Sequence, residues 1–123
     1  MSIHGDQLLF VYGTLRRGGS HHDLLHGAPM LGDWTSGPHF ELLDMGPYPA
    51  LLAGQGRVRG EIYRIGSHML PALDVYEGCP GDYRRERIHT PFGEAWVYLW
   101  DRPAPALSVI PGGDWLQHLA RRS

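Results

Sequence analysis

The sequence predicts an α+β fold built on a small mixed β-barrel of about six short strands. Glycine and proline are frequent, at 17 and 10 of 123 residues, and turn-forming residues at this density favour many short strands. Strand-like and helix-like segments do not alternate along the chain, which excludes a doubly wound parallel sheet. We expect residues 1–123 to form one domain with one modest core.

The N-terminal part begins with a buried strand and a glycine-containing loop. Residues 8–12 form an apolar run without a polar break, which predicts the strand. The loop covers residues 13–19. Ser20 is the expected N-cap of a short helix that Gly27 ends.

The middle of the chain predicts strands separated by Gly- and Pro-rich turns. The expected strands are Met30–Thr35, Phe40–Leu43, Ala50–Leu52 and residues 57–63.

A second helix is predicted from Ser67 to about Glu77, because Leu70, Leu73 and Tyr76 repeat at helical spacing and Gly78 follows.

Strand, turn and helix signals continue to the end of the sequence. We expect strands at Tyr83–His89 and Ala95–Trp100, joined by a turn at 90–94, then an extended segment at 103–113 and a helix capped by Asp114.

Composition predicts a small-molecule ligand. The net charge is −2 and the 11 basic residues are scattered, so neither nucleic acid nor an acidic membrane surface is an expected partner. Cys79 is the single cysteine, no signal-peptide pattern opens the sequence, and no apolar stretch approaches the roughly 20 residues that span a bilayer. We therefore expect a cytoplasmic protein. The sequence indicates no oligomeric state.

The segment Tyr12-Gly13-Thr14-Leu15 is the first candidate for a binding site. It follows the predicted buried strand directly. A glycine at a strand end lets a ligand approach the main chain, and successive N–H groups there can receive an anion.

Five motifs together resemble the γ-glutamylcyclotransferase family, in particular its γ-glutamylamine cyclotransferase-like branch. The resemblance continues through residues 95–98 and 113–115. In chain order, the five motifs are Tyr12–Leu15, Pro47-Tyr48-Pro49, Gly60-Glu61-Ile62-Tyr63, Leu73–Glu77 and Tyr83–Arg85.

The resemblance implies a barrel with helices packed outside and a cavity at one end. It also implies an amine-releasing lyase, an acyltransferase in older classification, that converts a γ-glutamyl amide or γ-glutamylamine to 5-oxoproline and a free amine. The α-amine of the substrate attacks its own γ-carbonyl, so no metal or organic cofactor is required.

The resemblance assigns the site residues. Glu77 matches the catalytic glutamate, acting first as general base and then as general acid, and Gly13, Thr14 and Leu15 match the substrate cradle. Tyr12, Tyr48 and Tyr83 would line the cavity. Independently, Glu77 lies in the last turn of its predicted helix without neighbouring cations, where the helix dipole raises a carboxyl pKa.

Other interpretations of these residues are weaker. An isolated glutamate is usually a solvated surface residue, but the full set of motifs favours catalysis for Glu77. Asp74 could form a glycosidase-like carboxylate pair with Glu77, although a structural hydrogen-bonding role is favoured. Cys79 could serve a thiol amidase, but a lone cysteine beside proline is more often a small buried residue.

Two further interpretations concern ligands. His22 and His26 could bind zinc with His21 or Asp23, but the resemblance argues against a metal, since the family has a histidine at the position of His22 without using one. Arg16 and Arg17 could bind phosphate, but without Walker spacing we expect solvated loop charges.

The main rival function is a non-catalytic binding module for a small carboxylate-bearing ligand. For the enzyme, the sequence leaves open whether the leaving group is an amino acid, a lysine side chain or a biosynthetic intermediate.

Overall fold

The computed structural model describes residues 6–103, 106 and 108–122. Within these ranges the chain forms seven β-strands, two α-helices and three short 3-10 helices. No helix in the described ranges is long and apolar enough to cross a membrane.

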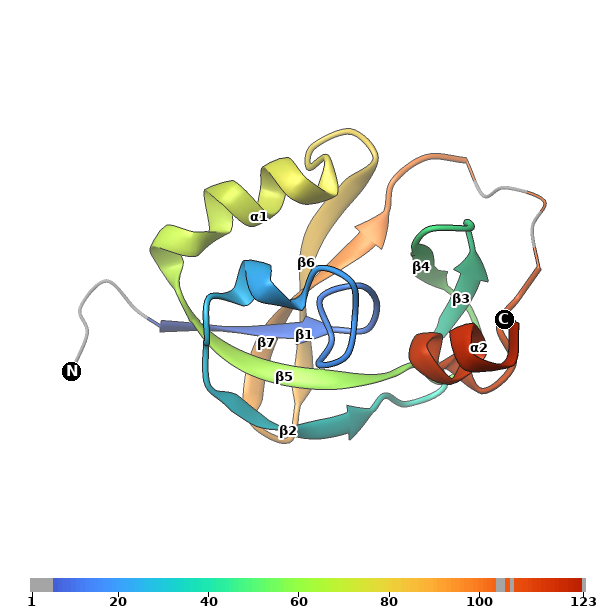
Figure 1. Cartoon of the computed structure of the whole chain (residues 1–123), viewed down its shortest axis with the longest axis horizontal. Coiled ribbons are helices and arrows are strands. Elements are labelled where there is room, and N and C mark those ends of the chain that lie inside the picture. The colour runs from blue at the N-terminus through green and yellow to red at the C-terminus, as the bar shows by residue number, and fades with distance from the viewer. Residues whose placement is uncertain (1–5, 104–105, 107, 123) are drawn as a thin grey trace.

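Five strands form the main sheet, in the order β2-β5-β1-β7-β6 (Figure 1). β1 and β7 run parallel, and the other neighbouring pairs are antiparallel. The bounds are β1 Asp6–Val11, β2 Met30–Thr35, β5 Arg59–Gly66, β6 Tyr83–Thr90 and β7 Gly93–Trp100.

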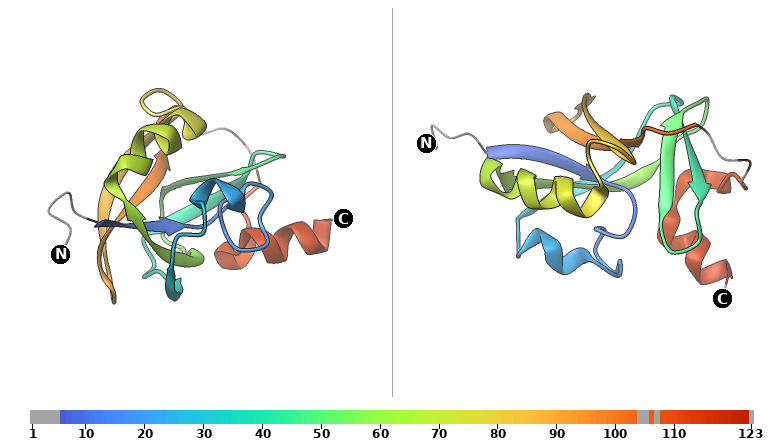
Figure 2. Two further views of the ribbon diagram at one scale, coloured as in Figure 1. Left: turned by 60° about the vertical axis from the view of Figure 1, so that its left-hand side comes forward. Right: turned by 90° about the horizontal axis from the view of Figure 1, so that it is seen from above.

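A separate hairpin of β3 (Phe40–Asp44) and β4 (Pro49–Ala53) lies at one end of the molecule beside helix α2 (Trp115–Arg122), as Figures 1 and 2 show. Asp44 joins the two elements. Its Oδ2 is 2.7 Å from His118 Nε2, and its Oδ1 accepts a hydrogen bond from Arg122 at 2.8 Å. The turn between β3 and β4 is thereby fastened to α2.

β1 lies between two hydrophobic clusters, one on each face of the main sheet. Leu9 and Val11 belong to the cluster that includes Leu25 and Leu73, whereas Phe10 belongs to the cluster beneath the hairpin and α2. Successive side chains of a strand point to opposite faces, so a strand buried on both faces has a continuous apolar sequence. Burial of β1 on both faces of the sheet explains the apolar run at residues 8–12.

The second predicted helix is confirmed. A 3-10 turn at Ser67–Met69 leads into α1 (Leu70–Glu77), and Gly78 ends it with φ +69°. This left-handed conformation is easily adopted by glycine. Leu73 anchors α1 in the core, so the final residue, Glu77, has a fixed position.

The C-terminal helix begins as predicted, because Asp114 Oδ1 accepts a hydrogen bond from the Gln117 N–H at 3.1 Å. Positions 104, 105 and 107 of the predicted extended segment lie outside the described residues. Its final part is not extended, because Pro111–Gly113 forms a 3-10 turn.

Other predictions need correction. The α+β class holds, but the barrel is not confirmed: among described residues, no pairing joins the edge strands β2 and β6. The Ser20 cap is wrong, because the first helix is only a 3-10 turn, η1 (His22–Leu25), without a side-chain cap. Ser20 instead bonds to His21 Nδ1 at 2.9 Å. The turn between β6 and β7 is shorter than predicted.

Candidate active site

A pocket of about 450 Å³ opens between the loop after β1, the C-terminal end of α1 and the β3–β4 turn. It brings together every residue that the sequence predicts for the site. These residues are Tyr12, Gly13, Thr14, Leu15, Tyr48, Glu77 and Tyr83.

The loop at residues 13–15 presents unused main-chain donors to this pocket. Among the described residues, no hydrogen bond uses the N–H of Gly13, Thr14 or Leu15. A Cβ on Gly13 would lie 2.8 Å from Pro49 Cγ, so the glycine permits close packing between the loop and the opposite wall. An anion could be received here by neutral donors.

Glu77 is the last residue of α1, and its side chain lines the pocket. Within the described part of the chain it has no hydrogen-bond or ion-pair partner. Burial raises its pKa from 4.5 to about 7 because a desolvated carboxylate loses the stabilisation that water gives its charge. A carboxyl group of this kind can both accept and return a proton near neutral pH.

Two tyrosines hold the walls of the pocket together. Tyr12 donates to the Tyr98 carbonyl oxygen at 2.6 Å, and Tyr83 donates to the Pro49 carbonyl oxygen at 2.8 Å. Burial raises the pKa of both phenols. Both hydroxyls therefore stay protonated and keep an oxygen lone pair available to a ligand N–H. Tyr48, by contrast, is exposed at the mouth of the pocket.

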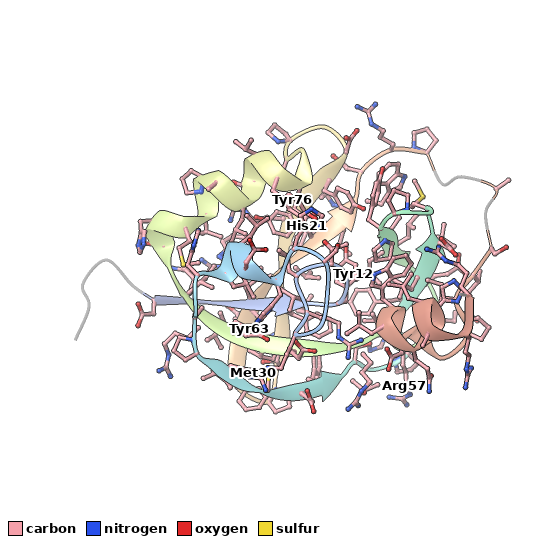
Figure 3. All side chains as sticks on the ribbon, viewed as in Figure 1. Tyr12, His21, Met30, Arg57, Tyr63 and Tyr76 are labelled. Carbon is pink, nitrogen blue, oxygen red and sulfur yellow. The ribbon has the colours of Figure 1, made fainter. Side chains whose placement is uncertain are left out.

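The pocket also contains residues that the sequence did not single out. Tyr76 shares a 2.7 Å hydrogen bond with Thr14 Oγ1, and the His21 ring centroid lies 5.1 Å from that of Tyr76. Figure 3 shows His21 and Tyr76 close together near the loop. From the sequence, Tyr76 was part of the helical repeat and of the Leu73–Glu77 motif but had no predicted role in the site, although its position next to Glu77 could have suggested one.

A comparison with known protein families identifies the family of the chain. The model of the family described as "Gamma-glutamyl cyclotransferase, AIG2-like" matches residues 9–117. The chain belongs to this γ-glutamylcyclotransferase family.

Relatives support the assignment. The γ-glutamylcyclotransferase family protein YtfP of Escherichia coli is 41% identical over 108 residues, covering 88% of this chain and 95% of YtfP. Bovine γ-glutamylaminecyclotransferase is 36% identical over 95 residues, covering 66% of this chain and 54% of that protein. A crystal structure of an uncharacterised Pyrococcus horikoshii protein superimposes with a TM-score of 0.83 at 27% identity, covering 94% of this chain and 95% of that one.

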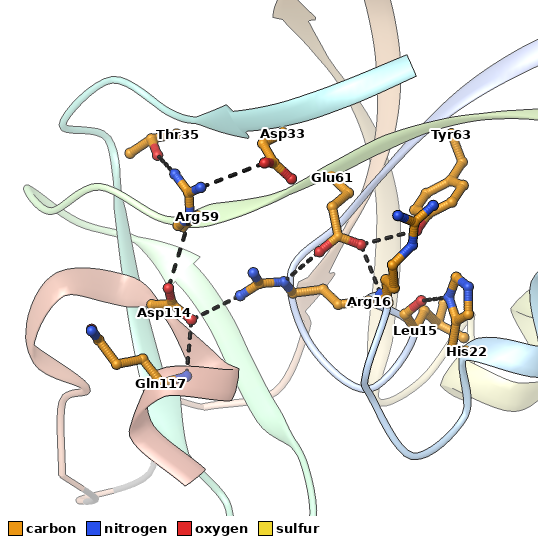
Figure 4. Close-up of polar contacts among 11 residues, drawn as sticks. Leu15, Arg16, His22, Asp33, Thr35, Arg59, Glu61, Tyr63, Asp114 and Gln117 are labelled. Carbon is orange, nitrogen blue, oxygen red and sulfur yellow. Dashed lines mark hydrogen bonds and ion pairs between the residues drawn. The ribbon is translucent and has the colours of Figure 1, made fainter. Parts of the chain in front are cut away.

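In this γ-glutamylcyclotransferase family member, contacts outside the pocket also fix the loop after β1. Arg16 is buried, contrary to the prediction of a solvated charge. Its Nε donates to Glu61 Oε2 and its Nη1 to Asp114 Oδ1, both at 2.9 Å. Glu61 Oε1 accepts from the Arg17 N–H at 2.8 Å and from the Tyr63 hydroxyl at 3.0 Å (Figure 4).

The residues weighed for other chemistry have structural contacts. Asp74 accepts hydrogen bonds from Arg85 Nε at 2.7 Å and from the Tyr98 hydroxyl at 2.8 Å, as expected for a structural role. His22 Nδ1 lies 2.8 Å from the Leu15 carbonyl oxygen. Among the described residues, no three His, Cys, Asp or Glu side chains are grouped closely enough to hold a metal ion.

Proposed function

We propose that the chain converts a γ-glutamyl amide to 5-oxoproline and a free amine, with Glu77 as general base and then general acid. The observation that carries the proposal is the Glu77 carboxylate, which has no hydrogen-bond or ion-pair partner among the described residues and lines one pocket with N–H groups of residues 13–15 that are likewise unused there. Membership of the γ-glutamylcyclotransferase family gives the reaction class.

The reaction needs one proton to be moved twice. Glu77 takes a proton from the substrate α-ammonium, and the resulting amine nitrogen attacks the γ-carbonyl carbon. A carbon–nitrogen bond forms and closes a five-membered ring, while the carbonyl oxygen takes up the electron pair. When the intermediate collapses, the carbonyl re-forms, the bond to the leaving nitrogen breaks and Glu77 returns the proton to that nitrogen. The ring nitrogen loses its second proton to solvent, and the released amine takes up a proton from solvent at neutral pH.

The pocket supplies the remaining requirements. The N–H groups of Gly13, Thr14 and Leu15 would receive the substrate α-carboxylate or the developing oxyanion. The oxygens of Tyr12 and Tyr83, whose protons are already donated elsewhere, would accept N–H bonds from the substrate amine. Because nucleophile and carbonyl belong to one molecule, holding the bent conformer supplies much of the catalysis.

The rival function is a binding module for a small carboxylate-bearing ligand. The free N–H groups suit it, but the Glu77 carboxylate opposes it, because a buried unpaired carboxylate weakens anion binding. A thiol or metal-dependent amidase would release free glutamate instead of 5-oxoproline.

The test is incubation of the purified protein with a panel of γ-glutamyl amides and detection of 5-oxoproline by mass spectrometry. Glu77→Gln should lose roughly a hundredfold to ten-thousandfold in kcat while remaining folded. Glu41→Gln, an exposed glutamate of β3, is the matched control and should keep full activity.

Each alternative has its own signature in the same assay. A fully active Glu77→Gln protein would contradict the proposed role of Glu77 in proton transfer. Thermal stabilisation by 5-oxoproline without turnover of any substrate would favour the binding module. Release of glutamate, abolished by an alkylating agent or a chelator, would favour the amidase.

A further inference from the structure

The mouth of the pocket carries an unusual share of exposed apolar surface. The described residues expose five large hydrophobic side chains, and three of them line this pocket: Tyr48 at 38%, Val75 at 81% and Tyr76 at 36% exposure. Single exposed apolar residues are ordinary, but a group of them around a pocket marks a binding surface. We call these three residues the rim.

The pocket is also poor in positive charge. None of the residues that line it is arginine or lysine, its one histidine among the described residues is His21, and its carboxylates are Glu77 and Asp82. Asp82 pairs with Arg102, which is exposed and outside the lining. A second carboxylate on the ligand would therefore meet two carboxylates without a guanidinium or ammonium partner among the described lining residues. The ring of His21 packs against Tyr76.

The rim lies where the leaving group must be. In the proposed reaction, the leaving nitrogen receives its proton from Glu77, so the body of the leaving amine extends from a point beside this residue. Val75 and Tyr76 precede Glu77 in the last turn of α1. Tyr76 is fixed by its hydrogen bond to Thr14 and by contact with the His21 ring. It therefore connects the loop at residues 13–15 to the rim.

We propose that the rim is a subsite for a leaving amine that has an apolar, preferably aromatic, body and no carboxylate beside the scissile amide nitrogen. Aromatic rings pack favourably on tyrosine faces and gain from burial of their apolar area. Of the leaving groups that the sequence leaves open, the subsite disfavours free amino acids. This inference rests on the proposed function.

A matched pair of substrates tests it directly. γ-Glutamyl-2-phenylethylamine and γ-glutamylphenylalanine differ only in the carboxylate beside the amide nitrogen. We expect kcat/KM for 5-oxoproline formation to favour the first by about tenfold or more. γ-Glutamylethylamine, which lacks the ring, should fall below γ-glutamyl-2-phenylethylamine.

A charge introduced at the rim provides the second measurement. Val75→Arg should raise kcat/KM for γ-glutamylphenylalanine relative to its carboxylate-free partner by roughly threefold or more. Val109→Arg is the control, because Val109 is also an exposed apolar residue, at 50%, but lies outside this pocket. It should leave the ratio unchanged.

The outcomes separate the subsite from the function. Equal rates for the matched pair, or a preference for γ-glutamylphenylalanine, overturn the subsite and leave the cyclisation intact. A ratio that Val75→Arg and Val109→Arg change alike also overturns it. Absence of 5-oxoproline from every substrate overturns the proposed function and the subsite with it.

Discussion

Two glutamates serve the loop at residues 13–19 in opposite ways. Glu61 is 4% exposed and accepts hydrogen bonds from the Arg16 side chain, the Arg17 N–H and the Tyr63 hydroxyl. Glu77 lines the pocket in front of the loop without such partners among the described residues. The same side chain is structural where its charge is matched and available for proton transfer where its charge is unmatched.

The contrast also separates stability from reactivity. A buried carboxylate with an arginine partner and further donors keeps its charge and fixes the chain around it. A carboxylate that is buried without such partners binds its proton more tightly, and it destabilises the fold when it ionises. The two positions should therefore respond differently to the same kind of substitution.

The largest effect is expected at Glu61. Glu61→Ala leaves the Arg16 guanidinium buried with Asp114 as its one remaining partner among the described residues. We expect a loss of about 3–5 kcal/mol in the free energy of unfolding. Urea titration measures it, with Glu41→Ala at an exposed position as the control. A Glu61→Ala loss no larger than that of the control would show that the buried network does not stabilise the loop.

Glu77→Gln should increase the free energy of unfolding, whereas Glu61→Ala should lower it. The folded-state pKa of Glu77 is about 7, above the ordinary 4.5, so wild-type stability falls as pH rises from about 4.5 to 7. We expect the variant to be more stable than wild type by up to about 3 kcal/mol at pH 8 and equally stable at pH 4. Urea titrations at both values would detect this, and a pH-independent difference would contradict it.

The raised pKa also predicts the pH dependence of turnover. Glu77 must be ionised to accept the first proton, so kcat/KM should fall about tenfold per pH unit below pH 7. An ordinary glutamate would keep the enzyme active down to about pH 4.5. Activity that stays flat from pH 7.5 to 5.5, in a protein shown to be folded throughout, would exclude Glu77 as the base.

The smallest effect is expected where the pocket side of the loop contacts α1. Tyr76→Phe removes the hydrogen bond to Thr14 but keeps the ring, and we expect a loss of about 0.5–1.5 kcal/mol in unfolding free energy. Thr14→Val should cost a similar amount, and the double variant should cost less than the sum. Strict additivity would show that the two side chains act independently.

The sequence predicted the end of α1 and the position of the loop after β1 because the signals there are local, whereas the grouping of the site residues came from the family resemblance. Gly78 immediately follows the helix that carries Glu77, and the loop glycine, Gly13, lies two residues after the end of the buried strand. Local turn and cap chemistry depends on a few neighbouring residues, which a single sequence displays.

The sequence predicted the buried network poorly because its partners are distant. Arg16 lies 45 residues from Glu61 and 98 residues from Asp114, and an arginine beside glycines has no local feature that indicates burial. Barrel closure depends on pairing between strands that are far apart in the chain, which periodicity does not report.

The contacts of α2 have a consequence for the order of assembly during synthesis. Asp114 accepts a hydrogen bond from Arg16 of the loop after β1. His118 and Arg122 contact Asp44, which precedes the turn that carries Tyr48. Two walls of the pocket thus depend on residues 114–122, which do not line it. A nascent chain on the ribosome therefore stays without a finished pocket until that helix has emerged, however early β1 and α1 have folded.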